Sequence, residues 1–113
     1  MKKKIAIPVD NAGLLDAHFG HCKFFALLKT NGEEIISEQL VTPPPHEPGL
    51  LPVWLAERGV TDIIAGGMGQ KAIQLFNLNG VNALVGAPKD AARKLAEGYV
   101  KGTLSLAANY CDH

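Results

Sequence analysis

Short apolar runs separated by turn-forming residues dominate the first part of the chain. A β-branched run from Ile5 to Val9 stops at Asp10-Asn11-Ala12-Gly13, as a buried strand does at a turn. Two further strand-like runs, Lys23 to Leu28 and Glu34 to Val41, flank an Asn-Gly pair, which is a strong hairpin signal. The pattern therefore predicts three strands, with the second and third paired antiparallel.

A proline-rich segment separates these strands from a helical region. Thr42 to Pro48 holds four of the seven prolines and cannot continue a strand, because proline lacks the N–H that a sheet needs. After this linker, apolar residues recur at helical spacing, including Trp54 on the expected core side, and Gly59 is suited to end the helix in the left-handed conformation. We expect a helix from Leu50 to about Arg58.

The rest of the chain alternates between the two kinds of pattern. Pro88 suits a first helical turn, where its missing N–H is not needed. Such alternation is typical of β-α-β units, which have parallel strands and right-handed crossovers. The expected elements are a strand over Thr61 to Ala65, a helix over Gln70 to Leu78, a strand over Val81 to Val85 and a helix over Pro88 to about Glu97.

Together these elements predict one α/β domain that covers residues 1–113. We expect a five-stranded mixed sheet in which the strands, counted along the chain, lie in the order 3-2-1-4-5, with the second antiparallel and helices on both faces. After the first strand the chain continues to the second strand on one side, and after the fourth strand it continues to the fifth on the other side. A crevice should therefore open between their carboxyl ends, where open α/β sheets bind ligands.

Composition narrows the class of protein. With 47% hydrophobic and 19% charged residues the chain is globular, and its 11 basic and 11 acidic residues create no field that would attract nucleic acid or an anionic membrane. The apolar run after Lys2 to Lys4 is too short for a signal peptide, and no later stretch spans a bilayer. We expect a cytoplasmic protein, in which a disulfide between Cys22 and Cys111 would be reduced and metal binding or thiol chemistry is favoured.

The segment after the first expected strand carries three potential metal ligands within five residues, namely His18, His21 and Cys22. Imidazole nitrogen and thiolate sulfur suit iron, copper, zinc and iron–sulfur clusters, and Gly20 lets the backbone turn between them. The alternative is that Phe19 and Cys22 anchor the loop in the core while both histidines are solvated.

A glycine turn follows the fourth expected strand and opens directly onto a helix. Its residues are Gly66, Gly67, Met68 and Gly69. Glycines let a ligand approach the backbone, and the N–H groups of a helix start favour an anion such as a negatively charged cluster. The turn lacks the ending of a P-loop. Met68 offers a soft thioether, although packing is the more usual role of such a methionine.

The chain ends with a second group of donors. Cys111 and His113 repeat the thiol and imidazole chemistry of the first loop. If the tail folds back over the crevice, the two segments supply two thiolates and three imidazoles to one site. The alternative is a frayed terminus, which is the commonest fate of terminal residues.

These features resemble the dinitrogenase iron-molybdenum cofactor biosynthesis family over nearly the whole chain, through His18-Phe19-Gly20-His21-Cys22, the turn at Gly66 to Gly69 and the element order. The resemblance implies a ribonuclease H-like fold and members that hold the iron-molybdenum cofactor or its iron–sulfur precursors. It implies that His18 contacts the cofactor and that Cys22 occupies a position where some members have cysteine. Cys111 and His113 match a tail of some stand-alone members, which the general pattern does not require.

The leading hypothesis is therefore a protein that binds and carries an iron–sulfur or iron-molybdenum cluster and is not an enzyme. Its expected partners are the metal cluster and the proteins that donate and accept it, with no nucleic acid and no membrane. Whether it is a monomer or a homodimer stays open, as does a role in nitrogen fixation. A zinc-binding or thiol-redox module is the alternative within the same donor chemistry.

Asp10, at the end of the first expected strand, has two interpretations. It is placed to accept a hydrogen bond from a histidine ligand and so to orient the ring beside the cofactor. It is also placed as one carboxylate of a magnesium-dependent, ribonuclease H-like nuclease. That activity needs several carboxylates together, whereas Asp62 lies at the opposite end of its strand and Glu33 and Glu34 lie in a turn. We rank the nuclease below the carrier.

Overall fold

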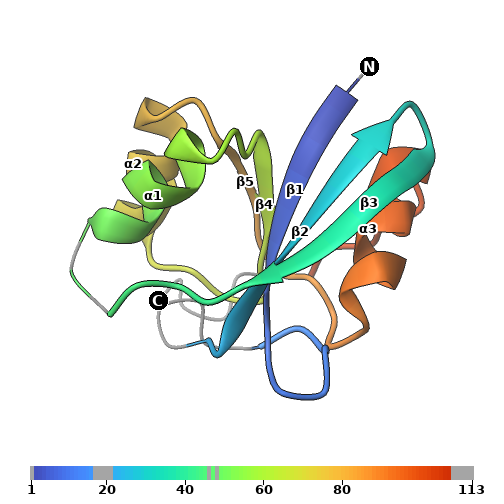
Figure 1. The fold of residues 1–113 in the computed structure, drawn as a ribbon, viewed down its shortest axis with the longest axis horizontal. Helices are drawn as coiled ribbons and strands as arrows, with labels where there is room; N and C mark the ends of the chain where they lie inside the picture. The colour runs from blue at the N-terminus through green and yellow to red at the C-terminus, as the bar shows by residue number, and fades with distance from the viewer. Residues whose placement is uncertain (1, 17–21, 46, 48, 108–113) are drawn as a thin grey trace.

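The computed structural model describes residues 2–16, 22–45, 47 and 49–107. The described chain forms one five-stranded sheet, and Figure 1 shows helices packed beside it. Among the described residues, none of the helices combines the length and the apolar character needed to cross a membrane. The elements in chain order are β1 (Lys2–Val9), β2 (Phe24–Asn31), β3 (Glu34–Val41), α1 (Leu50–Glu57), β4 (Asp62–Ile64), α2 (Gln70–Leu78), β5 (Asn82–Leu84) and α3 (Ala92–Lys101).

The strand order is β3-β2-β1-β4-β5, as the sequence pattern predicts. β2 pairs antiparallel with β1 and with β3, whereas β4 runs parallel to β1 and to β5. β1 is the central strand, and Ile5 to Val9 are all buried because both faces of the sheet are covered there. The predicted hairpin, central strand and β-α-β units are therefore confirmed.

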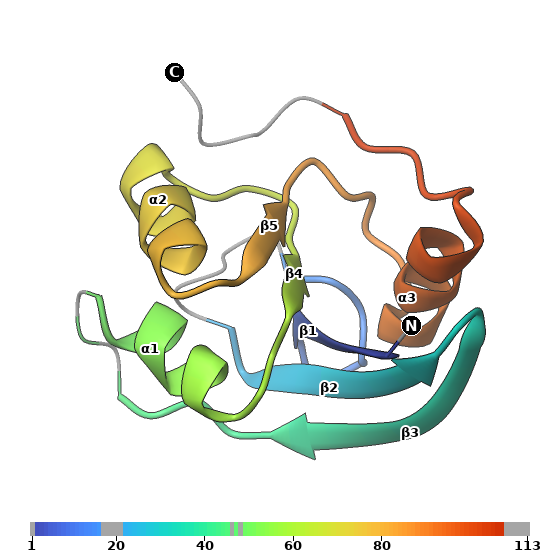
Figure 2. The ribbon, with the colours of Figure 1, turned by 90° about the horizontal axis from the view of Figure 1, so that it is seen from above.

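The sheet separates two apolar cores because side chains alternate along a strand. On β1, Ala6 contributes to the core under α1 and α2, while Ile5 and Ile7 contribute to the core under α3. Figure 2, seen from above, shows α1 and α2 on one face of the sheet and α3 on the other. The predicted placement of helices on both faces is confirmed.

The last helix differs from its prediction. The pattern places it over Pro88 to about Glu97, but α3 runs from Ala92 to Lys101. Asp90 and Ala91 pair with the loop after β1 instead: the N–H of Leu15 donates to the Asp90 carbonyl at 2.9 Å, and Leu14 forms a β-bridge with Ala91. These partners hold the chain extended, so Pro88 lies before the helix and not in its first turn.

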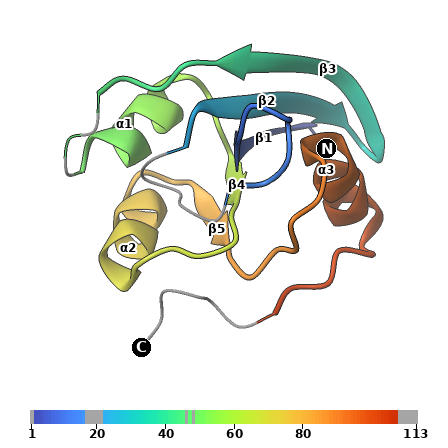
Figure 3. The same ribbon diagram turned by 90° about the horizontal axis from the view of Figure 1, so that it is seen from below.

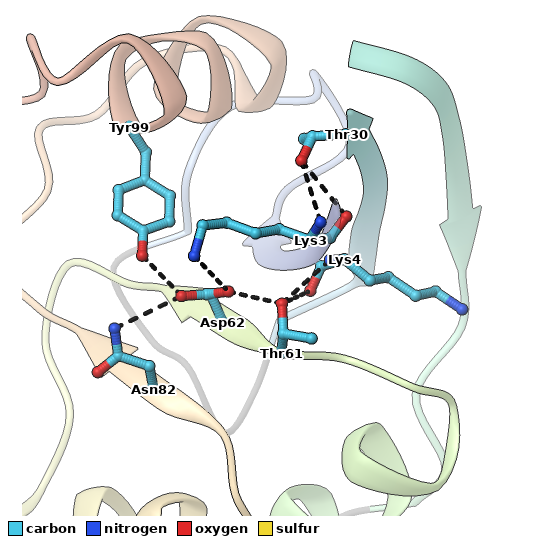
Figure 4. Close-up of polar contacts among 7 residues, drawn as sticks. All are labelled: Lys3, Lys4, Thr30, Thr61, Asp62, Asn82 and Tyr99. Carbon is cyan, nitrogen blue, oxygen red and sulfur yellow. Dashed lines mark hydrogen bonds and ion pairs between the residues drawn. The ribbon is translucent and has the colours of Figure 1, made fainter. Parts of the chain in front are cut away.

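A buried carboxylate joins α3 to the amino end of β4 (Figure 4). Asp62 is 2% exposed and accepts hydrogen bonds from the hydroxyls of Tyr99 (2.7 Å) and Thr61 (2.6 Å). The Lys3 ammonium lies 3.9 Å from the same carboxylate, and the Asn82 amide lies 3.4 Å from it. Because a buried charge needs partners, this network fixes α3 against the sheet.

Candidate functional site

Three parts of the chain meet at the carboxyl edge of the parallel strands, which Figure 3 shows from below. β1 and β4 are parallel neighbours, so the loop after β1 and the turn after β4 leave the sheet at the same edge. Their register pairs Ile5 with Asp62 and Ala6 with Ile63, and β1 continues to Val9. The third part is the end of the described chain near Ala107.

The loop after β1 folds back along its own strand. The Asp10 carboxylate accepts hydrogen bonds from the backbone N–H groups of Ala12 (2.9 Å) and Leu14 (3.1 Å), which closes a tight turn. The N–H of Asp16 then donates to the Pro8 carbonyl at 2.9 Å. Asp10 thus shapes the loop, and its expected role beside a histidine ligand stays a prediction.

Cys22 brings a thiol from the start of β2 to this edge. The side chain is 8% exposed and belongs to the same apolar core as Met68 of the glycine turn. Burial, followed by the nearby negative charge of Asp16, raises the pKa of the Cys22 thiol to about 12. The free thiol is therefore neutral near pH 7, and a metal ion would have to displace its proton.

Asp16 is the residue that sequence reasoning missed. Its charge acts on the Cys22 thiol, although the two residues are separated by the segment that carries His18 and His21. The hydrogen bond from the Asp16 N–H to the Pro8 carbonyl fixes this position. The position of Asp16 in the sequence, two residues before His18, could have indicated that its carboxylate lies near the proposed ligands. Asp16 opposes a bare thiolate, but it would favour a metal cation bound to the same sulfur.

The glycine turn combines a buried part and an open part. Met68 is 1% exposed within the core, which favours packing over the thioether ligand considered from the sequence. Gly69 is exposed, and a Cβ added there would meet nothing within 4 Å. Among the described residues, no side chain caps the start of α2 and no acid lies in its first turn. The first N–H groups of α2 therefore remain compatible with an anion.

A second glycine, at position 86, joins the end of the described chain to this turn. The N–H of Gly86 donates to the Gly66 carbonyl at 2.8 Å, and the N–H of Ala107 donates to the Gly86 carbonyl at 2.7 Å. Gly86 has a φ of +89°. A Cβ there would lie 1.9 Å from the Ala107 carbonyl oxygen. This contact, which we call the Gly86 clasp, brings the chain back to the glycine turn immediately before the terminal residues.

Four of the five predicted metal ligands lie outside the described residues, namely His18, His21, Cys111 and His113. Within the described ranges, no three His, Cys, Asp or Glu side chains gather as a metal site. Asp10 follows β1 at the carboxyl edge, whereas Asp62 begins β4 and is held by Lys3 and Tyr99. These two carboxylates thus lie at opposite ends of the sheet, which gives the nuclease hypothesis no support.

Comparisons with known proteins agree with this architecture. The family model described as "Dinitrogenase iron-molybdenum cofactor" matches residues 1–102. The solved structure of PH0822 is similar over 94% of both chains, with 26% identity and a TM-score of 0.83. The apo form of the orange protein from Desulfovibrio gigas is similar over 95% of this chain and 94% of that one, with 21% identity and a TM-score of 0.77. No curated protein matches the chain.

Proposed function

Because the chain belongs to the dinitrogenase iron-molybdenum cofactor family, we propose that it is a non-catalytic carrier that holds an iron–sulfur or iron-molybdenum type cluster at the carboxyl edge of its sheet. The observation that carries the proposal is the meeting of three segments there: the loop between β1 and β2, the glycine turn and the Gly86 clasp. The loop contains His18, His21 and Cys22, and the Gly86 clasp is followed in the sequence by Cys111 and His113.

The proposed ligands are within reach of this edge. His18 and His21 lie between the described residues Asp16 and Cys22. Cys111 follows Ala107 by four residues, which span at most about 14 Å when extended, and His113 follows by six, at most about 22 Å. We assign the cluster to His18, His21 and Cys22, with Cys111 and His113 as additional ligands from the tail.

The glycine turn supplies a suitable wall for an anionic cargo. The first intrahelical hydrogen bond of α2 runs from the Ile73 N–H to the Gly69 carbonyl at 3.1 Å, so earlier N–H groups of the helix have no acceptor within it. The open space beside Gly69 lets a cluster approach these groups. We assign cofactor contacts to Asp10, Gly66, Gly67 and Gly69 and to the backbone of Met68, whose side chain is packed in the core.

The state of Cys22 suits a protein that is alternately loaded and empty. Without metal, burial keeps the thiol protonated, and a protonated thiol reacts slowly with oxidants and electrophiles. Binding of a metal replaces the proton with a cation and releases that proton to solvent. The empty carrier would thus be protected, and its loading would be favoured by rising pH.

A carrier also needs proteins from which it receives its cargo and to which it delivers it. We infer that a cluster-assembly protein and an acceptor protein dock in turn at this edge, in the cytoplasm. A monomer that uses its own tail and a homodimer that shares a cluster through Cys111 are both compatible with the donor set. Size measurements on the empty and loaded protein distinguish them.

The proposal is tested by metal analysis of protein purified without oxygen, followed by anaerobic reconstitution with ferrous iron and sulfide. We expect iron in the protein and charge-transfer absorption in the visible range. His18→Ala should abolish the absorption, whereas His46→Ala, which removes a histidine of the proline-rich linker, should leave it unchanged. Equal absorption in both variants, or a wild type without a chromophore, would overturn the proposal, and zinc as the sole bound metal would favour the zinc-binding alternative.

A further inference from the structure

A basic hollow lies at the other end of the sheet, beside the amino end of β1. Its volume is about 430 Å³. Among the described residues, those that line it include four lysines and no acid. The described residues that line it are Lys2, Lys3, Lys4, Lys29, Thr30, Ile36, Gly59 and Thr61. Since β1 and β4 are parallel, this hollow and the glycine turn lie at opposite edges.

The strand register places like charges together in this hollow. Lys4 of β1 lies directly opposite Lys29 of β2. Side chains at directly opposed positions share a face of the sheet, and two like charges there destabilise the pairing. The Lys4 ammonium also donates a 2.6 Å hydrogen bond to the Arg58 carbonyl, which holds it at the end of α1 near a further cation.

Two carboxylates of the neighbouring strands, Asp62 and Glu38, pair with other cations. Figure 4 shows the ammonium groups of Lys3 and Lys4 pointing in opposite directions, with Lys3 directed to Asp62. Glu38 pairs with Arg93 at 3.6 Å. These two carboxylates are therefore paired with cations other than Lys2, Lys4 and Lys29. Consistent with this, burial and then the charges of Lys29 and Arg58 lower the pKa of Lys4.

We propose that the basic hollow binds a small oligoanion of the phosphate class through Lys2, Lys4 and Lys29. Lysine ammonium groups are flexible point charges that suit phosphate oxygens, and the Thr61 hydroxyl lies on the same lining. Three cations exceed the charge of a single phosphate, so a linked pair or triplet of phosphate groups matches them better. Binding would replace the repulsion between Lys4 and Lys29 with two attractions to one ligand.

The test is a calorimetric titration of the full chain with inorganic tripolyphosphate at low ionic strength. Wild type should bind, and affinity should fall as salt is added, because screening weakens such contacts. Lys29→Gln should weaken binding about tenfold, which corresponds to one lost charge-assisted hydrogen bond. Lys89→Gln removes the same charge from an exposed position outside the hollow and should bind as wild type does.

Thermal melting distinguishes a folding defect from a binding defect. Lys29 is exposed, so Lys29→Gln should fold and should melt at or slightly above the wild-type temperature without ligand. Absence of tripolyphosphate binding to wild type, or equal affinities of the Lys29→Gln and Lys89→Gln variants, would overturn the proposal. So would equal affinity of wild type for orthophosphate and tripolyphosphate. The cluster proposal is unaffected by these results, because Lys2, Lys4 and Lys29 lie at the edge of the sheet opposite the proposed cluster site.

Discussion

The carbonyl oxygen of Ala107 occupies the space that a side chain at Gly86 would need, since a Cβ there would lie 1.9 Å from it. Gly86→Ala should therefore displace the segment before the tail and strain a backbone with a φ of +89°. We expect a loss of roughly 3–4 kcal/mol in the free energy of unfolding, measured with urea. We also expect weaker cluster retention after reconstitution.

Gly80→Ala is the matched control for this experiment. Gly80 has a similar φ of +77°, but a Cβ there meets nothing within 4 Å. This variant should lose about 1–2 kcal/mol from backbone strain and should retain cluster as wild type does. If both variants behave alike, the contact with Ala107 contributes nothing beyond the backbone conformation.

Removal of the tail tests its part in the site separately from the fold. A chain that ends at Ala107 keeps the Gly86 clasp and both apolar cores, so its unfolding free energy should stay within about 0.5 kcal/mol of wild type. If Cys111 and His113 are ligands, this chain should lose iron faster than wild type when a chelator is added. Equal rates of iron loss would remove the tail from the proposed ligand set.

The Cys22 thiol should react slowly at neutral pH, because its pKa is raised to about 12 and the thiolate is the nucleophile. In a Cys111→Ser background, the rate of alkylation by iodoacetamide should rise towards pH 12. Asp16→Asn removes a negative charge beside the sulfur, lowers this pKa and should increase the rate at pH 8. A rate unchanged by Asp16→Asn would show that burial accounts for the whole shift.

Tyr99 should make stability depend on pH in the alkaline range. Burial and then the hydrogen bond and charge of Asp62 raise the pKa of Tyr99 above its ordinary value of 10.0. The folded state thus holds the phenol proton more tightly, so this contribution is complete below pH 10 and is lost as pH rises through the folded pKa. Unfolding free energies measured at pH 8 and above pH 10 should show the fall.

Tyr99→Phe separates this effect from other alkaline changes. The substitution removes the 2.7 Å hydrogen bond to buried Asp62 and should cost about 1–3 kcal/mol at pH 8. It should also reduce the further loss above pH 10. If the unfolding free energy of the variant falls above pH 10 as much as that of wild type, groups other than Tyr99 cause the fall.

The sequence predicts those features that depend on local pattern. The Asn31-Gly32 pair marks the hairpin between β2 and β3, and the buried run on β1 marks the central strand. Gly59 ends α1 with a φ of +82°, as its position indicates. These signals lie within a few residues of the structure that they specify, so no knowledge of distant contacts is needed.

Features that depend on distant contacts were not predictable in the same way. Pro88 looks like a helix start, but the pairing of Leu15 with Asp90 holds its neighbours extended. The local sequence around Gly86 does not indicate that a glycine is required there, because the space for a side chain is taken by the distant residue Ala107. The effect of Asp16 on Cys22 likewise arises only when the loop folds back along β1. The five proposed metal ligands stay predictions.

The register between β1 and β4 divides the sheet into two unequal ribbons. β1 and β2 pair along eight positions and β3 extends that ribbon, whereas β4 and β5 are three residues each and join β1 at Ile5 and Ala6. Cys22 lies two residues before β2 of the large ribbon, and the glycine turn follows β4 of the small one. If the chain holds a cluster here as we propose, slight separation of β4 from β1 would widen the space between Cys22 and the glycine turn.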